Sequence, residues 1–142
     1  MKLLIDADGC PVVDIAVRLA AEYKAECLIL CDTSHVFERE GASTVTVSKG
    51  ADSVDFAIVN MVLRGNIVIT QDYGLAAMCL SKNAIVLSQD GMVYCDGNIE
   101  ALLQQRHSAK KIRMSGGRLR GCAKRTKEQD ESFEKKLREI LG

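Results

Sequence analysis

Within residues 1–96, short apolar runs of strand length alternate with segments whose apolar residues recur at helical spacing. "ECLILC", residues 26–31, is the clearest run, and its continuous apolar character is typical of a strand covered on both faces. "KLLID", "STVTVS", "NIVIT" and "AIVLS" are further strand candidates. Strands that alternate with helices predict a mainly parallel central sheet flanked by helices. The fold class predicted for the chain is therefore α/β.

The pattern changes after residue 96. "NIEALLQQRH" predicts a helix, whereas residues 106–127 have no apolar periodicity and predict a basic loop. A capping box formed by Thr126 and Gln129 predicts a helix over the final residues of the chain. We predict a single domain over residues 1–142, with an α/β body (1–96) and C-terminal helices (97–142) that enclose the basic loop 106–127.

Several protein classes are disfavoured by composition. No apolar run approaches the roughly 20 residues that a membrane helix requires. The short apolar run before Asp6 is not typical of a signal peptide. The six cysteines include no Cys-x-x-Cys pair, which disfavours a structural zinc site. We therefore expect a cytoplasmic protein that does not enter the membrane.

Acidic residues follow the predicted strands repeatedly. Asp6 and Asp8 come at the end of the first strand, Asp52 and Asp55 come after the third at the start of a helix, and Asp72 follows the fourth. In open parallel sheets, sites form beyond the carboxyl ends of the strands. We therefore expect these carboxylates to meet at one edge of the sheet.

Each of these acids also has a purely structural interpretation. Asp8, Asp52 or Asp72 could cap the helix that follows it, because Asp is a favoured N-cap residue. Asp55 could interact with the dipole in the first turn of its helix. The sequence alone leaves both interpretations open.

Several carboxylates brought together repel one another unless a cation lies between them. Oxygen ligands without a His or Cys cluster favour Mg²⁺ or Mn²⁺ over zinc. The predicted metal ligands are Asp6, Asp8, Asp55 and Asp72, and Asp52 joins them in the predicted catalytic set. Thr70 and Gln71 precede Asp72 and are expected to orient it through hydrogen bonds.

Four motifs occur in an order that resembles a known bacterial family. They are "DADGCP", "ADSVDFAIV", "NIVITQDYGLAA" and "VLSQDGMVY". Together they are similar to the YaiI/YqxD family (UPF0178), which is assigned to the PIN-like superfamily. The resemblance spans nearly the whole chain and implies a PIN-like fold and a Mg²⁺- or Mn²⁺-dependent nuclease that acts on RNA.

The resemblance also implies roles for individual acids. By motif position, Asp6 is similar to the first PIN carboxylate, and Asp72 to the acid after the fourth strand. Asp52 or Asp55 is similar to the acid on the helix. Asp8 belongs to the Asp-Ala-Asp motif of the family itself.

Charge is segregated along the chain. Residues 106–127 carry nine Lys or Arg and no Asp or Glu, whereas residues 1–105 carry seven basic and 14 acidic residues. A basic segment of this kind favours binding to a phosphate backbone. We expect nucleic acid as the partner, with RNA favoured, and predict as its contacts Lys110, Lys111, Arg113, Arg118, Arg120, Lys124 and Arg125.

Two other functions remain open. Asp-x-Asp after a first strand is also typical of phosphatases of the haloacid dehalogenase type, with Asp6 as nucleophile and Asp8 as general acid. A module that binds RNA through residues 106–127 without cleaving it would also explain the segregated charge.

Overall fold

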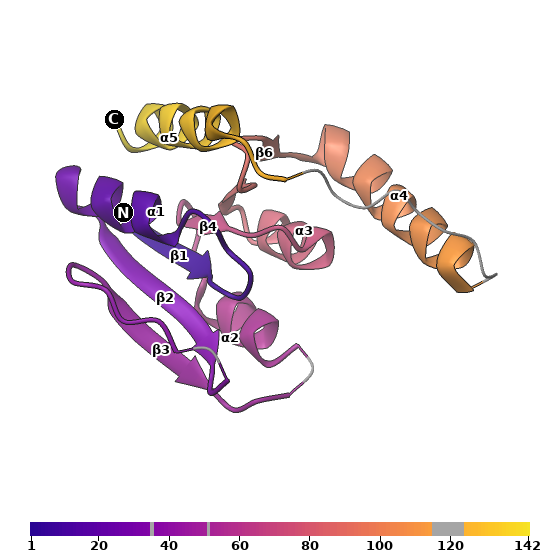
Figure 1. The fold of residues 1–142 in the computed structure, drawn as a ribbon, viewed down its shortest axis with the longest axis horizontal. Coiled ribbons are helices and arrows are strands. Elements are labelled where there is room, and N and C mark those ends of the chain that lie inside the picture. Colours follow the sequence, from indigo (N-terminus) through magenta and orange to yellow (C-terminus); the bar gives the residue numbers. More distant parts are fainter. Residues whose placement is uncertain (35, 51, 115–123) are drawn as a thin grey trace.

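The computed structural model describes residues 1–34, 36–50, 52–114 and 124–142, with residues 106–114 as backbone alone (Figure 1). The elements follow one another in this order: β1 (Lys2–Asp6), α1 (Val13–Glu22), β2 (Glu26–Asp32), β3 (Ser43–Val47), α2 (Ser53–Met61), β4 (Ile67–Ile69), α3 (Tyr73–Ser81), β5 (Ile85–Leu87), β6 (Val93–Tyr94), α4 (Asp96–Met114) and α5 (Lys127–Leu141).

The six strands form one sheet in the order β3-β2-β1-β4-β5-β6. All neighbouring pairs are parallel except β5 and β6, which are antiparallel. The predicted α/β class with a mainly parallel sheet is thus confirmed. β1 pairs with β2 on one side and with β4 on the other, so the strand order reverses at β1. In such sheets the crevice at the point of reversal is the preferred place for a ligand.

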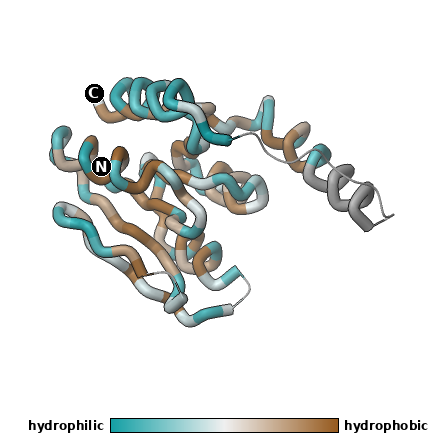
Figure 2. The backbone as a smooth tube through the Cα atoms, in the orientation of Figure 1, coloured by the Kyte–Doolittle hydropathy of each residue, from teal (hydrophilic) through white to brown (hydrophobic). Residues whose placement is uncertain are grey.

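Helices cover both faces of the sheet because successive side chains of a strand point to opposite sides. In β1, Leu3 and Ile5 pack into the core layer beneath α1 and α5. Leu4 points the other way, into the layer formed with α2, α3 and the start of α4. Figure 2 shows the central strands in the hydrophobic colour and most of α5 in the hydrophilic colour. The continuous apolar runs of the sequence are explained by this double cover.

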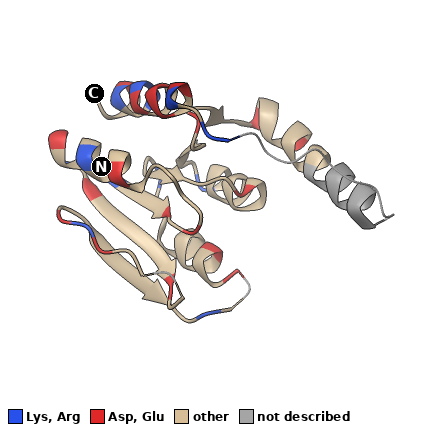
Figure 3. Ribbon diagram, viewed as in Figure 1, with Lys and Arg blue, Asp and Glu red and all other residues tan. Residues whose placement is uncertain are grey.

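The C-terminal helix forms as its sequence predicts. Thr126 accepts a hydrogen bond from the Gln129 backbone, and the Gln129 side chain accepts one from the Thr126 backbone. Phe133 and Leu137 are fully buried against the α1 layer. Basic and acidic residues alternate over the exposed surface of α5 (Figure 3), and Arg138 pairs with Glu22 of α1 at 3.0 Å. Apolar burial and ion pairs therefore join the two helices.

The basic loop was predicted to begin at residue 106, and this boundary is wrong. Residues 106–114 continue α4, which starts against α3 and then extends away from the sheet (Figure 1). Ala, Lys, Arg and Met are strong helix formers, and a helix that leaves the core needs no apolar stripe.

In the described parts of the chain, no helix combines the length and apolar character that a membrane crossing needs.

The short strand β6 was not predicted. It pairs with β5 through a turn in which the Ser88 N–H donates to the Met92 carbonyl at 2.8 Å. Asp90-Gly91 within this turn is the type of dipeptide that favours hairpins. β6 places Tyr94, which is almost fully buried, so that its hydroxyl donates to the Thr70 carbonyl at 3.3 Å.

The turn between β5 and β6 also receives the start of α5. Gly91 has a φ of +87°, and a Cβ atom at this position would lie 2.6 Å from the Ser132 carbonyl oxygen. Arg125 donates to the Gln89 carbonyl at 2.6 Å and to Asp90 at 2.9 Å. The close backbone approach and the arginine together hold α5 on this turn.

Replacing Gly91 with Ala should reveal how tightly this contact is packed. Gly65 is the matched control, because its φ is +82° but a Cβ atom there meets nothing within 4 Å. We expect Gly65→Ala to lower the free energy of unfolding by about 1–2 kcal/mol through backbone strain alone. Gly91→Ala should cost about 1–3 kcal/mol more because the methyl group collides with α5. Urea denaturation measures both, and equal losses would contradict the close contact.

Candidate active site

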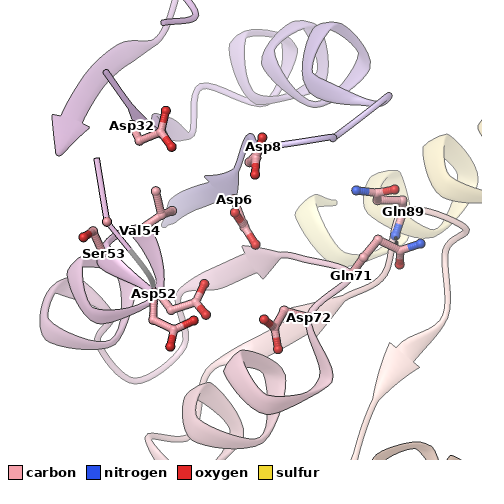
Figure 4. A pocket seen from close by; sticks show the side chains of 11 residues that line it. Asp6, Asp8, Asp32, Asp52, Ser53, Val54, Gln71, Asp72 and Gln89 are labelled. Carbon is pink, nitrogen blue, oxygen red and sulfur yellow. Dashed lines mark hydrogen bonds between the residues drawn. The ribbon is translucent and has the colours of Figure 1, made fainter. Parts of the chain in front are cut away.

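A cavity of about 400 Å³ opens at the carboxyl edge of the sheet, over the ends of β1, β2 and β4 and the start of α2. Figure 4 shows side chains from these elements pointing into it. Its lining consists of Asp6, Asp8, Asp32, Gly50, Asp52, Ser53, Val54, Asp55, Gln71, Asp72 and Gln89. All five predicted acids are brought together there. Among the described residues of the lining, six are aspartates and none is Lys, Arg or His.

A buried hydroxyl connects the two acids at the centre of the sheet. Thr70, which has no exposed surface, donates from Oγ1 to Oδ2 of Asp6 at 2.8 Å. The same oxygen accepts a hydrogen bond from the Asp72 backbone N–H at 3.0 Å. Thr70 therefore contacts both acids, although it had been expected to orient Asp72 alone.

Asp72 caps α3, as the structural interpretation of the sequence allowed. Its Oδ1 accepts hydrogen bonds from the backbone N–H groups of Gly74 at 2.9 Å and Leu75 at 3.2 Å. The same carboxylate lines the cavity. Capping and a place in the site are thus compatible in one residue, since a carboxylate has a second oxygen.

Side-chain capping does not explain Asp52 or Asp8. Asp52 occupies the N-cap position of α2 with a left-handed φ of 62°, and its side chain makes no capping hydrogen bond. Asp8 is exposed, and the N-cap of α1 is Val12. Asp55 lies in the first turn of α2, where a negative charge interacts favourably with the helix dipole.

The acids disfavour one another's ionisation. Burial raises the pKa of Asp6 from 3.8 to about 6; the hydrogen bond from Thr70 opposes the rise, and the charges of Asp72 and Asp8 add to it. The pKa of Asp55 is raised to about 7. Burial is the largest cause, and the charges of Asp72, Asp6 and Asp52 and a hydrogen bond with Asp72 add to the rise. Ionising these two carboxyl groups at neutral pH therefore costs free energy in the folded state.

Besides Ser53 at the start of α2, two polar residues of the lining, Asp32 and Gln89, were not in the predicted site. Asp32 ends β2, and its Oδ1 accepts a hydrogen bond from the Ser34 backbone at 2.8 Å. Gln89 follows β5, and its backbone N–H donates to the Gln71 side chain at 3.3 Å. Their sequence signal was the same as that of the predicted acids, because each is a polar residue at or just after the carboxyl end of a strand.

The donor chemistry of the cavity fits a hard cation. Carboxylates are the oxygen ligands that Mg²⁺ and Mn²⁺ prefer. A cation would offset both the burial of negative charge and the repulsion between the acids, which together raise the pKa of Asp6 and Asp55. The carboxylates do not form a complete set of metal ligands in this structure. Over residues 1–34, 36–50, 52–114 and 124–142, no group of three or more His, Cys, Asp or Glu side chains is arranged to hold a metal ion.

The predicted nucleic-acid contacts differ in how far the structure describes them. Arg118 and Arg120 lie outside the described residues, and Lys110, Lys111 and Arg113 lie on α4, where backbone alone is described. Lys124 is exposed. Arg125 bonds to Asp130 at 2.7 Å as well as to the β5–β6 turn, which makes it a structural anchor.

Residues 4–142 match the sequence model of a family described as "Uncharacterized BCR, YaiI/YqxD family". A UPF0178 protein of Exiguobacterium sibiricum is 50% identical over 141 residues, which cover 99% of this chain and 96% of the relative. One from Ruminiclostridium cellulolyticum is 50% identical over 137 residues, or 96% of this chain and 90% of the relative. Among solved structures, the crystal structure of Rae1 (YacP) from Bacillus subtilis aligns with a TM-score of 0.46 and 14% identity, covering 99% of this chain and 96% of that one.

The raised pKa values predict how stability depends on pH in the absence of metal. Because the pKa of Asp6 is about 6 and that of Asp55 about 7 in the folded state, folding takes up protons between about pH 4 and pH 7. The free energy of unfolding should therefore fall as pH rises through this window. Asp55→Asn should flatten the fall and stabilise the protein by about 1–2 kcal/mol at about pH 8, an amount reduced by solvent screening.

Urea denaturation in a chelator at several pH values measures this effect. Glu100→Gln, which removes an exposed acid on α4 outside the cavity, is the control and should retain the wild-type slope. A less stable Asp55→Asn protein at about pH 8 would show that the carboxylate stabilises the fold, contrary to the expected repulsion.

Proposed function

The chain belongs to the YaiI/YqxD family, and we propose that it is a Mg²⁺- or Mn²⁺-dependent nuclease of the PIN-like superfamily that hydrolyses phosphodiester bonds in RNA. The observation that carries the proposal is the cavity of six aspartates at the point where the strand order of the sheet reverses. Repulsion within this cluster costs stability, so a function that requires a cation is the best explanation for it.

In this proposal Asp6, Asp8, Asp55 and Asp72 hold the cation. When bound, Mg²⁺ or Mn²⁺ supplies a Lewis acid for a phosphoryl oxygen and increases the acidity of the attacking water. Asp52, on the exposed side of the cavity, faces the approaching substrate. Thr70 positions Asp6 through the hydrogen bond to its carboxylate, and Gln71 is fixed by the backbone of Gln89.

RNA is the proposed partner because the chain separates its charges. The acidic cavity repels phosphate in the absence of a cation, whereas the basic segment 106–127 attracts it. In this proposal the basic segment attracts the RNA, and the cation neutralises the charge of the cavity. The basic segment thus binds the RNA, and the acidic cavity hydrolyses it.

A calorimetric titration with Mn²⁺ tests the metal site. We expect micromolar binding to the wild type and a loss of at least about tenfold in affinity in Asp6→Asn and Asp72→Asn, since each removes a charged oxygen ligand. Asp32→Asn is the matched control, because Asp32 lines the same cavity but is not a proposed ligand. Equal binding by all four proteins would contradict the assignment of the ligands.

Cleavage of a single-stranded RNA tests the activity. Asp6→Asn should lower the rate about 100-fold or more, chelation should abolish it, and Asp32→Asn should retain most of it. Cleavage that survives in Asp6→Asn would contradict the proposal. Phosphate trapped covalently on Asp6 would instead indicate a phosphatase, and salt-sensitive RNA binding without turnover would indicate a binding module.

A further inference from the structure

A second hollow of about 210 Å³ adjoins the acidic cavity between α2 and α3. The two share Asp52, Asp55 and Asp72 in their linings. The remaining residues of the second hollow are Phe56, Gly74, Leu75 and Met78. The shared carboxylates therefore have an acidic space on one side, and on the other a space that Phe56, Leu75 and Met78 line together with them.

Phe56 is unusually exposed for its type. Its exposed fraction is 61%, it belongs to neither core cluster, and it is one of only three phenylalanines in a chain without tryptophan. It directly follows Asp55 and lies one helical turn after Asp52, which accounts for its place beside the acids. Met78 on α3 is 40% exposed, and the buried Leu75 lies beneath.

We propose that this hollow binds a single base of a single-stranded nucleic acid, with the face of the base stacked on the Phe56 ring and against Met78. The inference rests on the proposed function, which places the phosphate of the same nucleotide, or of its neighbour, in the adjoining acidic cavity. Stacking on an aromatic side chain accepts any base, because every base has a π-face.

The chemistry of the hollow selects a base over other occupants. Phosphate would be repelled by the three shared carboxylates, and an aliphatic side chain would desolvate them without offering a hydrogen bond. A base has an apolar face for Phe56 and N–H donors along its edge for a carboxylate such as Asp52. The volume is below the roughly 300–1,000 Å³ of pockets for drug-sized ligands, which suits one ring system.

The composition of the basic segment points the same way. Residues 106–127 contain no Phe, Tyr or Trp, so they attract phosphates without offering one of these rings as a stacking surface. Proteins that bind single-stranded nucleic acid combine a positively charged surface with aromatic side chains on which bases stack. Phe56 supplies such a platform next to the acids.

Fluorescence offers a readout that is independent of cleavage, because the chain has no tryptophan. Phe56→Trp introduces a single tryptophan in the hollow, whose emission can be excited selectively over that of the three tyrosines. We expect a 2′-O-methyl phosphorothioate hexamer of adenosine, whose backbone resists hydrolysis, to quench it in the presence of Mg²⁺. An abasic hexamer with the same backbone should not. Leu63→Trp is the control, since Leu63 is 66% exposed but does not line the hollow, and its emission should stay unchanged.

Affinity for the adenosine hexamer gives the second readout. Phe56→Ala should weaken binding about fivefold or more, Phe56→Tyr should retain it, and Leu63→Ala should leave it unchanged. Because Phe56 is exposed and outside the core, its replacement should not unfold the protein. Equal quenching by the abasic hexamer, or unchanged affinity in Phe56→Ala, would overturn the inference.

The outcomes separate this inference from the proposed function. RNA cleavage without base-dependent quenching would overturn the base site and leave the nuclease in place. Base-dependent quenching in a protein that does not cleave RNA would support the base site and contradict the proposed nuclease activity. A shift in emission that depends on protein concentration, without any oligonucleotide, would show that a second copy of the chain covers Phe56, and would also overturn the inference.

Discussion

The hydrogen bond between Thr70 and Asp6 determines how the candidate site is arranged. Its donor lies at the end of β4 and its acceptor at the end of β1, the two central strands that meet where the strand order reverses. The same hydroxyl accepts from the Asp72 backbone, and the Thr70 carbonyl accepts from the buried Tyr94. Every partner in this series of hydrogen bonds belongs to the end of a strand or the start of a helix, so these elements set the positions of the two acids.

The sequence predicted those parts of the molecule that depend on local patterns. Apolar runs identified four of the five parallel strands, the β-branched run STVTVS identified β3, and the capping box at Thr126 located the start of α5. Asp6 and Asp72 could be assigned to one edge because parallel strands end at the same side of a sheet. The clustering of the five acids followed from topology, and needed no knowledge of side-chain contacts.

Contacts between distant segments were beyond such patterns. Nothing local distinguishes Arg125, which anchors α5 to the β5–β6 turn, from the basic residues that were expected to bind phosphate. Gln89 enters the cavity because this turn is held in place by a helix some 40 residues later in the chain. The length of α4 was missed for a different reason, since a helix that leaves the body has no apolar face to detect.

Two unfavourable features lie on either side of the same three carboxylates. On one side burial, together with the charges of the neighbouring acids, raises the pKa of Asp55 to about 7, and on the other a phenylalanine ring remains mostly in water. A fold selected for stability alone would have little reason to keep either. The proposed nucleotide would relieve both together, because its phosphate would bring a cation to the acids and its base would cover the ring. The juxtaposition therefore argues for a ligand that is anionic at one end and aromatic at the other.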